Sequence, residues 1–67
     1  MSHYDYQASK QLAAQDPPFA ALIMAAYRKA DTGNGALLEQ AFPDICRELR
    51  ARYDAPGGLL PGEAVSA

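Results

Sequence analysis

The apolar residues of the chain concentrate in one run of nine positions, Phe19–Tyr27. At about 100° per residue, the apolar side chains of this segment gather on one broad face, formed by Phe19, Leu22, Ile23, Ala26, Tyr27 and Ala30. The spacing predicts a helix that Asp16 caps, that has Pro17 in its first position and that runs to about Asp31. We expect the broad apolar face to be its core side.

The opposite face of this helix carries fewer charges than a solvated face normally shows. It presents Ala21, Met24, Ala25, Arg28 and Lys29. The two alanines leave a smooth strip on which another backbone can come close, and methionine adapts to an irregular neighbour. Two interpretations stay open. Either neighbouring helices cover both sides of a central helix, or Ala21, Met24, Ala25 and Arg28 bind a second copy of the chain or a partner protein.

A helix is also predicted before this one, at residues 4–14. Ser2 and Asp5 have the S-x-x-D spacing of a capping box. Tyr4, Ala8 and Leu12 recur every four residues and form a thin apolar stripe. We expect this helix to pack on one side of the central helix.

Two more helices are predicted in the second half of the chain. One runs from Asn34, as N-cap, to Ala41, and a second starts with Pro43 in its first position. The latter carries Ile45, Leu49 and Tyr53 on one side, with Cys46 at the edge of that side. No segment shows the alternation of a strand. The sequence therefore predicts an all-α fold, a small bundle of three to four short helices over residues 1–56.

The last part of the chain, residues 57–67, combines glycine and proline with few large apolar side chains. This composition is typical of an irregular C-terminal tail that is either flexible or docked on the surface of the bundle. Leu59 and Leu60 lie between a diglycine and a Pro-Gly pair. They are candidates for a short apolar segment that binds a partner.

Length and composition narrow the class of protein. A chain of 67 residues forms one domain at most and buries only roughly 60% of its unfolded surface. The formal net charge of −2 disfavours binding to nucleic acid or to anionic lipid. The longest apolar run is about half of what a membrane span needs, and no segment has the pattern of a signal peptide. We expect a cytoplasmic protein.

Candidate chemistry is sparse. Cys46 is the single cysteine and His3 the single histidine, so the sequence predicts no disulfide, no structural zinc site and no cofactor. Cys46 with His3 would make a nucleophile only if the fold brought them together, and a packed core cysteine is the favoured interpretation. No carboxylate spacing forces a catalytic pair. We therefore expect no enzymatic activity and name no catalytic residue.

The helix that follows Pro43 contains the basic segment "RELRAR", residues 47–52. A break followed by an arginine-containing helix is the pattern of a helix-turn-helix DNA-binding protein. However, the three arginines project in different directions and alternate with carboxylates. Asp44 with Arg47 and Glu48 with Arg52 have the spacing of intrahelical ion pairs. A solvated helix face is the favoured interpretation.

Three segments carry a resemblance to known sequences. They are "DPPFAALIMAA" at residues 16–26, "ADTGN" at residues 30–34 and "RYDAPGGLLPGE" at residues 52–63. With the residues around them, they resemble a group of small, uncharacterised proteins encoded by actinobacterial phages and prophages, over nearly the whole chain. The resemblance implies an accessory protein that acts inside a bacterial host, where phage proteins of this size commonly bind a larger host protein. It implies no particular site residue.

Two hypotheses on function follow. The first is a small protein-binding accessory factor, phage-encoded, that binds or inhibits a larger host protein, or pairs with a second copy of itself. Its binding residues would be Ala21, Met24, Ala25 and Arg28 with Leu59 and Leu60. The alternative is a small helix-turn-helix-like DNA-binding regulator.

Overall fold

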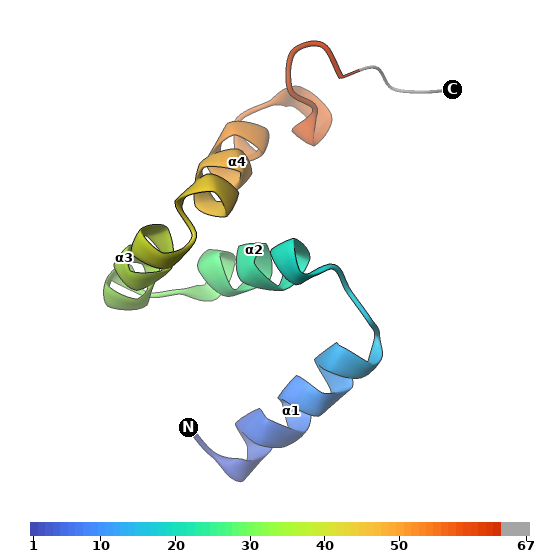
Figure 1. The fold of residues 1–67 in the computed structure, drawn as a ribbon, viewed down its shortest axis with the longest axis vertical. Coiled ribbons are helices and arrows are strands. Elements are labelled where there is room, and N and C mark those ends of the chain that lie inside the picture. Colours follow the sequence, from blue (N-terminus) through green and yellow to red (C-terminus); the bar gives the residue numbers. More distant parts are fainter. Residues whose placement is uncertain (64–67) are drawn as a thin grey trace.

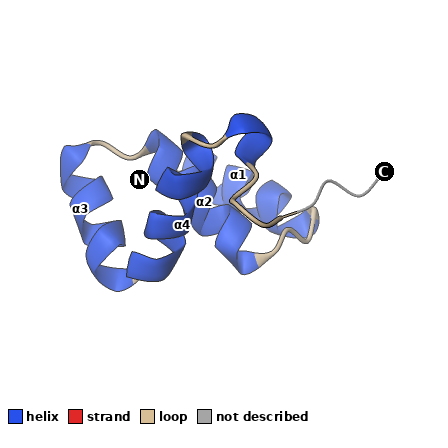
Figure 2. Ribbon diagram, turned by 90° about the horizontal axis from the view of Figure 1, so that it is seen from above, coloured by secondary structure: helices blue, strands red, loops and turns tan. Residues whose placement is uncertain are grey.

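Four helices follow one another in the computed structural model of the chain, which describes residues 1–63 (Figure 1). They are α1 (His3–Ala14), α2 (Phe19–Lys29), α3 (Thr32–Ala41) and α4 (Pro43–Tyr53), and a 3-10 turn, η1 (Pro56–Gly58), follows them. Within residues 1–63 the remaining backbone is loop, and no strand occurs (Figure 2). The predicted all-α fold, a small helical bundle, is confirmed. Residues 64–67 of the predicted tail lie outside the described residues.

The first helix begins with the predicted capping box. Ser2 Oγ accepts a hydrogen bond from the backbone N–H of Asp5 at 3.1 Å, and Asp5 Oδ2 accepts one from the Ser2 N–H at 3.0 Å. Two of the four N–H groups that a helix start leaves without partners are thereby satisfied. The local sequence therefore specifies where α1 starts.

The predicted start of α2 is wrong. Asp16 does not cap the helix and Pro17 is not its first residue; Pro18 occupies the N-cap position, without a side-chain hydrogen bond. The reason is the second proline, because a residue that precedes proline is sterically excluded from the helical region. Pro17 precedes Pro18, so helical geometry begins only after both prolines. Asp16 adopts a left-handed conformation, with φ of 53°.

The border between α2 and α3 also differs from the prediction. Ala30 is extended, with ψ of 141°, so α2 ends at Lys29 instead of Asp31. Asp31 is instead the N-cap of α3, and its Oδ1 accepts a hydrogen bond from the Asn34 N–H at 2.8 Å. Asn34, the predicted N-cap, is the third helical residue. Aspartate and asparagine both cap helices well, and here the earlier residue, Asp31, forms the cap.

The fourth helix starts at Pro43 as predicted, and it supplies the centre of the bundle. Cys46 is 3% exposed and Leu49 is 6% exposed, and they are the buried apolar side chains of the described chain. Cys46 is thus not at the edge of the apolar side. Tyr53 was predicted on that side and is 72% exposed.

The covered side of the central helix differs in part from the prediction. Its partly buried side includes Ile23, Met24 and Tyr27, whereas Phe19 and Ala26 of the predicted core side are exposed. Leu22 and Ala30 of the predicted core side are also half-buried, so the buried side is the predicted one extended toward Met24. Helices α3 and α4 both contact α2, whereas α1 does not.

The expectation that α1 covers α2 is wrong. Within residues 1–63, α1 packs against no other helix, and none of its residues is buried. Figure 1 shows α1 and α2 as the two arms of a V that diverge from the link at residues 15–18. The radius of gyration is therefore 14.2 Å, against roughly 11 Å for a compact domain of this length. The bundle itself consists of α2, α3 and α4.

A substitution at Gly35 tests how closely α2 and α3 pack. Gly35 is buried in α3, and a Cβ at this position would lie 3.7 Å from Tyr27 Cε1, an ordinary contact distance. Gly35→Ala should therefore gain helix propensity without a clash and stabilise the chain by about 0.5–1 kcal/mol. Thermal unfolding followed by circular dichroism measures the change.

Gly33→Ala is the matched control. Gly33 is exposed in the first turn of the same helix, so it offers the change in propensity without the contact to Tyr27. If Gly35→Ala lowers the stability while Gly33→Ala does not, then Gly35 lies closer to Tyr27 than the 3.7 Å contact allows.

Candidate functional site

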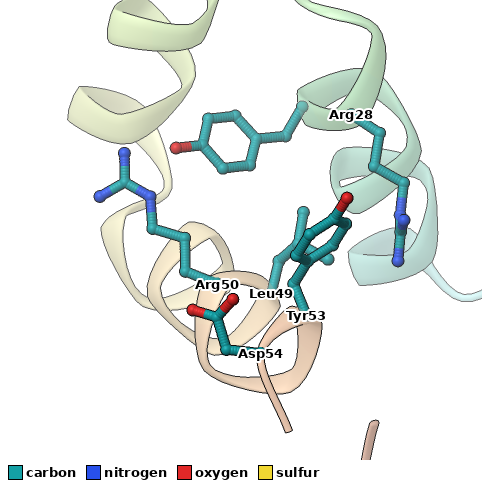
Figure 3. A pocket seen from close by; sticks show the side chains of 6 residues that line it. Arg28, Leu49, Arg50, Tyr53 and Asp54 are labelled. Carbon is teal, nitrogen blue, oxygen red and sulfur yellow. The ribbon is translucent and has the colours of Figure 1, made fainter. Parts of the chain in front are cut away.

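A cleft of about 540 Å³ lies between the C-terminal halves of α2 and α4 (Figure 3). Helix α2 supplies Tyr27 and Arg28 to its lining. Helix α4 and its C-cap supply the other lining residues, which are Leu49, Arg50, Tyr53 and Asp54. Two tyrosines and two arginines thus surround the buried Leu49, and we call this feature the α2–α4 cleft.

One side of the cleft is held by a polar network that joins three helices. The hydroxyl of Tyr27 in α2 and Nη2 of Arg50 in α4 both donate to Oε1 of Glu39 in α3. The Arg50 guanidinium carbon also lies 5.7 Å from the centroid of the Tyr27 ring, a cation–π distance. The hydrogen bond to the Glu39 carboxylate, together with partial desolvation, raises the pKa of Tyr27 above its usual 10.0.

The other side of the cleft carries an exposed aromatic ring and an exposed cation. The Arg28 guanidinium carbon lies 5.7 Å from the centroid of the Tyr53 ring, and the two side chains lie next to each other, across the cleft from Arg50 (Figure 3). Among residues 1–63, no carboxylate lies within ion-pair distance of Arg28. Arg28 therefore keeps its hydrogen-bond donors available beside an accessible ring.

The other arginines of α4 are paired. Arg47 lies 3.0 Å from Asp44 and Arg52 lies 3.8 Å from Glu48, so both predicted intrahelical ion pairs are confirmed. With Arg50 bound to Glu39, each arginine of this helix faces at least one carboxylate. The basic segment of α4 is therefore electrically balanced along its length.

Residues 57–63 are attached to α4 through Arg52. Its Nη1 donates to the carbonyl oxygen of Gly58 and to Oε1 of Glu63, both at 2.8 Å, and its Nη2 lies 2.7 Å from Glu63 Oε2. The Glu63 carboxylate also accepts the backbone N–H of Leu60 at 2.8 Å. These bonds lower the pKa of Glu63 from 4.5 to about 2, with the Arg52 contact as the main cause.

The predicted binding residues are divided among different surfaces. Ala21 and Ala25 are exposed on α2, whereas Met24 is half-buried on the side that carries Ile23 and Tyr27. Arg28 lies at the α2–α4 cleft. Leu59 and Leu60 are half-buried in the segment that Arg52 holds. The structure therefore does not bring these six residues together, and their role in binding stays a prediction.

The prediction missed Tyr27 and Tyr53 as cleft residues, because it assigned the tyrosines mainly to the core. The arginine-aromatic pairs join α2 to α4, and residues so far apart in sequence leave no periodic signal. The sequence offered one weak sign of this site: Arg50 and Tyr53 are three positions apart and therefore lie on neighbouring positions of one helix face.

His3 and Cys46, which were considered as a nucleophilic pair, lie in helices that do not contact each other. His3 lies in α1 and contacts Gln7 at 3.0 Å, whereas Cys46 is buried in α4, which α1 does not contact. Within residues 1–63, no three His, Cys, Asp or Glu side chains are grouped so that they could hold a metal ion. None of the helices there combines the length and the hydropathy that crossing a membrane requires.

Comparison of the chain with protein-family models, with curated proteins and with solved structures gives no match.

The raised pKa of Tyr27 gives a test of the network. Because the folded state favours the protonated phenol, the stability that Tyr27 contributes is present below pH 10 and is lost as the pH rises through its raised pKa. Glu39→Gln should bring the pKa of Tyr27 back toward 10. A pH titration of the ring carbons of labelled tyrosine by NMR measures it.

Asp54→Asn serves as the control, because Asp54 lines the same cleft without a bond to Tyr27. This variant should leave the Tyr27 titration unchanged. A Tyr27 pKa at or below 10 in the unmodified chain would contradict the described network.

The lowered pKa of Glu63 predicts acid release of residues 57–63 from α4. The unfolded pKa is near 4.5 and the folded one about 2, so the contribution to stability is present above pH 4.5 and is lost as the pH falls toward 2. The Leu60 amide resonance, whose N–H binds Glu63, should report this transition with a midpoint near pH 2.

Glu63→Gln should abolish that transition, and Glu48→Gln should keep it, because the Glu48 contact to Arg52 is the longer one, at 3.8 Å. Added salt should weaken the effect since both side chains are partly exposed. A midpoint near 4.5 in the unmodified chain would show that Glu63 does not bind Arg52 in solution.

Proposed function

We infer that this chain is a small protein-binding accessory factor, and that the α2–α4 cleft is the surface with which it binds a larger bacterial host protein. The observation that carries the proposal is the Arg28–Tyr53 pair at the cleft opening, where a cation with no ion-pair partner among residues 1–63 lies beside an exposed ring.

The composition of the cleft is that of protein interfaces. Tyrosine and arginine are the residues most enriched among those that dominate binding energy, together with tryptophan. Tyr53 offers a large ring with few rotatable bonds, so ordering it on binding costs little conformational entropy. Leu49 at the base of the cleft adds an apolar contact.

The chemistry of the cleft specifies the kind of partner segment. Arg28 has free donors that suit a carboxylate, since guanidinium and carboxylate groups form paired hydrogen bonds. The rings of Tyr27 and Tyr53 suit an apolar or planar side chain. We therefore propose that the bound segment carries an acidic residue next to an apolar one.

The resemblance to small actinobacterial phage and prophage proteins supports a host protein as the target. In that setting, attachment to the host protein either inhibits it or redirects it. The cytoplasm of the bacterial host is the corresponding location.

The alternative function, a helix-turn-helix-like DNA-binding regulator, receives less support. DNA affinity depends on cations that neutralise phosphates. In α4, Arg47, Arg50 and Arg52 are all engaged by carboxylates, and a phosphate would have to displace these. We therefore favour protein binding over DNA binding.

Affinity capture with the full chain as bait in an extract of actinobacterial cells tests the proposal. A protein bound through the cleft should be captured by the unmodified chain and lost with Arg28→Ala and with Tyr53→Ala. In a titration with the isolated partner, each variant should weaken the affinity about 30-fold or more, as is typical of residues that dominate an interface.

Arg47→Ala is the matched control, since Arg47 is an exposed arginine of α4 outside the cleft. It should leave capture unchanged. Capture that is equal with all four chains would overturn the assignment of the cleft, and steep salt-dependent binding to duplex DNA would favour the alternative function.

A further inference from the structure

Helix α1 exposes an apolar stripe that no other part of the described chain covers. Tyr4 is 79% exposed and Leu12 is 52% exposed, and Ala8 lies between them on the same face. The stripe spans about 12 Å, at 1.5 Å per residue. A helix of this length is marginal by itself in water and normally depends on packing of its apolar face. The stripe therefore requires a surface to pack on.

The uncovered side of α2 provides such a surface. Phe19 is 61% exposed, although its ring contacts that of Phe42 edge-on, with 5.7 Å between the ring centroids. It shares this side with the half-buried Leu22 and the exposed Ala26, at the i, i+3, i+7 spacing of a helix-binding face. Next to it, an apolar groove of about 520 Å³ runs between α2 and α3. Its lining includes Ala26, Ala30, Leu37, Leu38 and Ala41. We call this surface the α2–α3 face; its small side chains permit a close approach.

The chain exposes more surface than a compact monomer of its mass. The accessible surface is 5526 Å² for a mass of 7.2 kDa. A folded monomer of that mass exposes roughly 4,100 Å², so the excess is about 1,400 Å². The exposed stripe of α1 and the α2–α3 face both contribute to this excess, and pairing two copies would bury each of them twice.

The link between α1 and α2 holds α1 away from the face of its own chain. Pro17 and Pro18 follow one another, and Pro18 is extended, with φ of −58° and ψ of 145°. Consecutive prolines restrict the backbone of the link, so α1 and α2 stay apart as the two arms of the V. A second chain offers the same face without a change in the link.

The charges beside the two surfaces are complementary. Asp5 borders the stripe on α1, and its Oδ2 atom is the one engaged in the capping box. Lys29 lines the α2–α3 groove, and within residues 1–63 no carboxylate lies within ion-pair distance of it. An α1 helix placed on this groove brings a carboxylate to a lysine, once in each half of a symmetric pair.

We propose that two copies of the chain form a helix-exchanged dimer, in which α1 of each copy packs its Tyr4–Ala8–Leu12 stripe on the α2–α3 face of the other. The α2–α4 cleft lies on the other side of α2 and remains open in this dimer. The proposal therefore goes beyond the proposed function, and either can fail without the other.

Sedimentation velocity of the full chain at micromolar concentration, with circular dichroism on the same samples, tests the dimer. The unmodified chain should sediment as a dimer. Leu12→Glu on the stripe and Leu37→Glu on the α2–α3 face should each raise the dissociation constant at least 100-fold. Both side chains are largely exposed in the single chain, so the helical signal of α2–α4 should persist in both variants. Lys10→Glu, on the other side of α1, is the control and should leave the dimer intact.

Isotope-filtered NMR on a mixture of labelled and unlabelled chains distinguishes exchange from other arrangements. Contacts of the Leu12 methyl groups with Leu37 or Ala26 should appear between chains. The proposal is overturned by a monomeric unmodified chain, by the same contacts occurring only within one chain, or by a dimer that survives both glutamate substitutions.

Discussion

The Glu39 carboxylate is the point at which α2, α3 and α4 meet through their side chains. It accepts hydrogen bonds from Tyr27 and from Arg50, residues that are 12 and 11 positions away from it along the chain. With Cys46 and Leu49 as the buried apolar pair of the described residues, little hydrophobic burial is available to fix the angles between the helices. Hydrogen bonds to charged groups are directional and stronger than those between neutral groups. This network therefore fixes the angles between the helices, which the small core alone would not.

The same network shapes the candidate binding surface. Because Arg50 is bound to Glu39 and lies over the Tyr27 ring, both side chains are held in place before any partner arrives. Preformed side chains lose less conformational entropy on binding. Arg28 and Tyr53 on the opposite side lack such bonds within the described chain and can adapt to a partner. The cleft therefore combines one fixed side with one adaptable side.

Local signals in the sequence predicted the parts of the fold that depend on neighbouring residues. The Ser2–Asp5 capping box, the start of α4 at Pro43 and the ion pairs of Arg47 and Arg52 all follow from spacings of three or four residues. The capping error at Asp16 arose from the two prolines that follow it, and the error at Asn34 arose because Asp31 was also eligible. In each case the backbone restriction of a neighbour, or the position of a second cap, decided the outcome.

The arrangement of the helices depends on contacts that the sequence pattern does not encode. The periodicity of α2 identified an apolar helix, but which residues are covered depends on where α3 and α4 lie, and both contact α2. Met24 is half-buried for this reason and Phe19 is exposed. Likewise, the candidate cleft consists of pairs such as Arg28 with Tyr53, which only the crossing of α2 and α4 creates.

The burial of Cys46 has a consequence for how the bundle opens. At 3% exposure, its thiol is out of reach of alkylating reagents and of other thiols while α3 and α4 remain packed. Reaction at sulfur requires a transient separation of these helices, and its rate is governed by the population of the opened state. The rate at which Cys46 reacts with a thiol reagent therefore reports how often the bundle opens. A contact that holds the helices together lowers that rate.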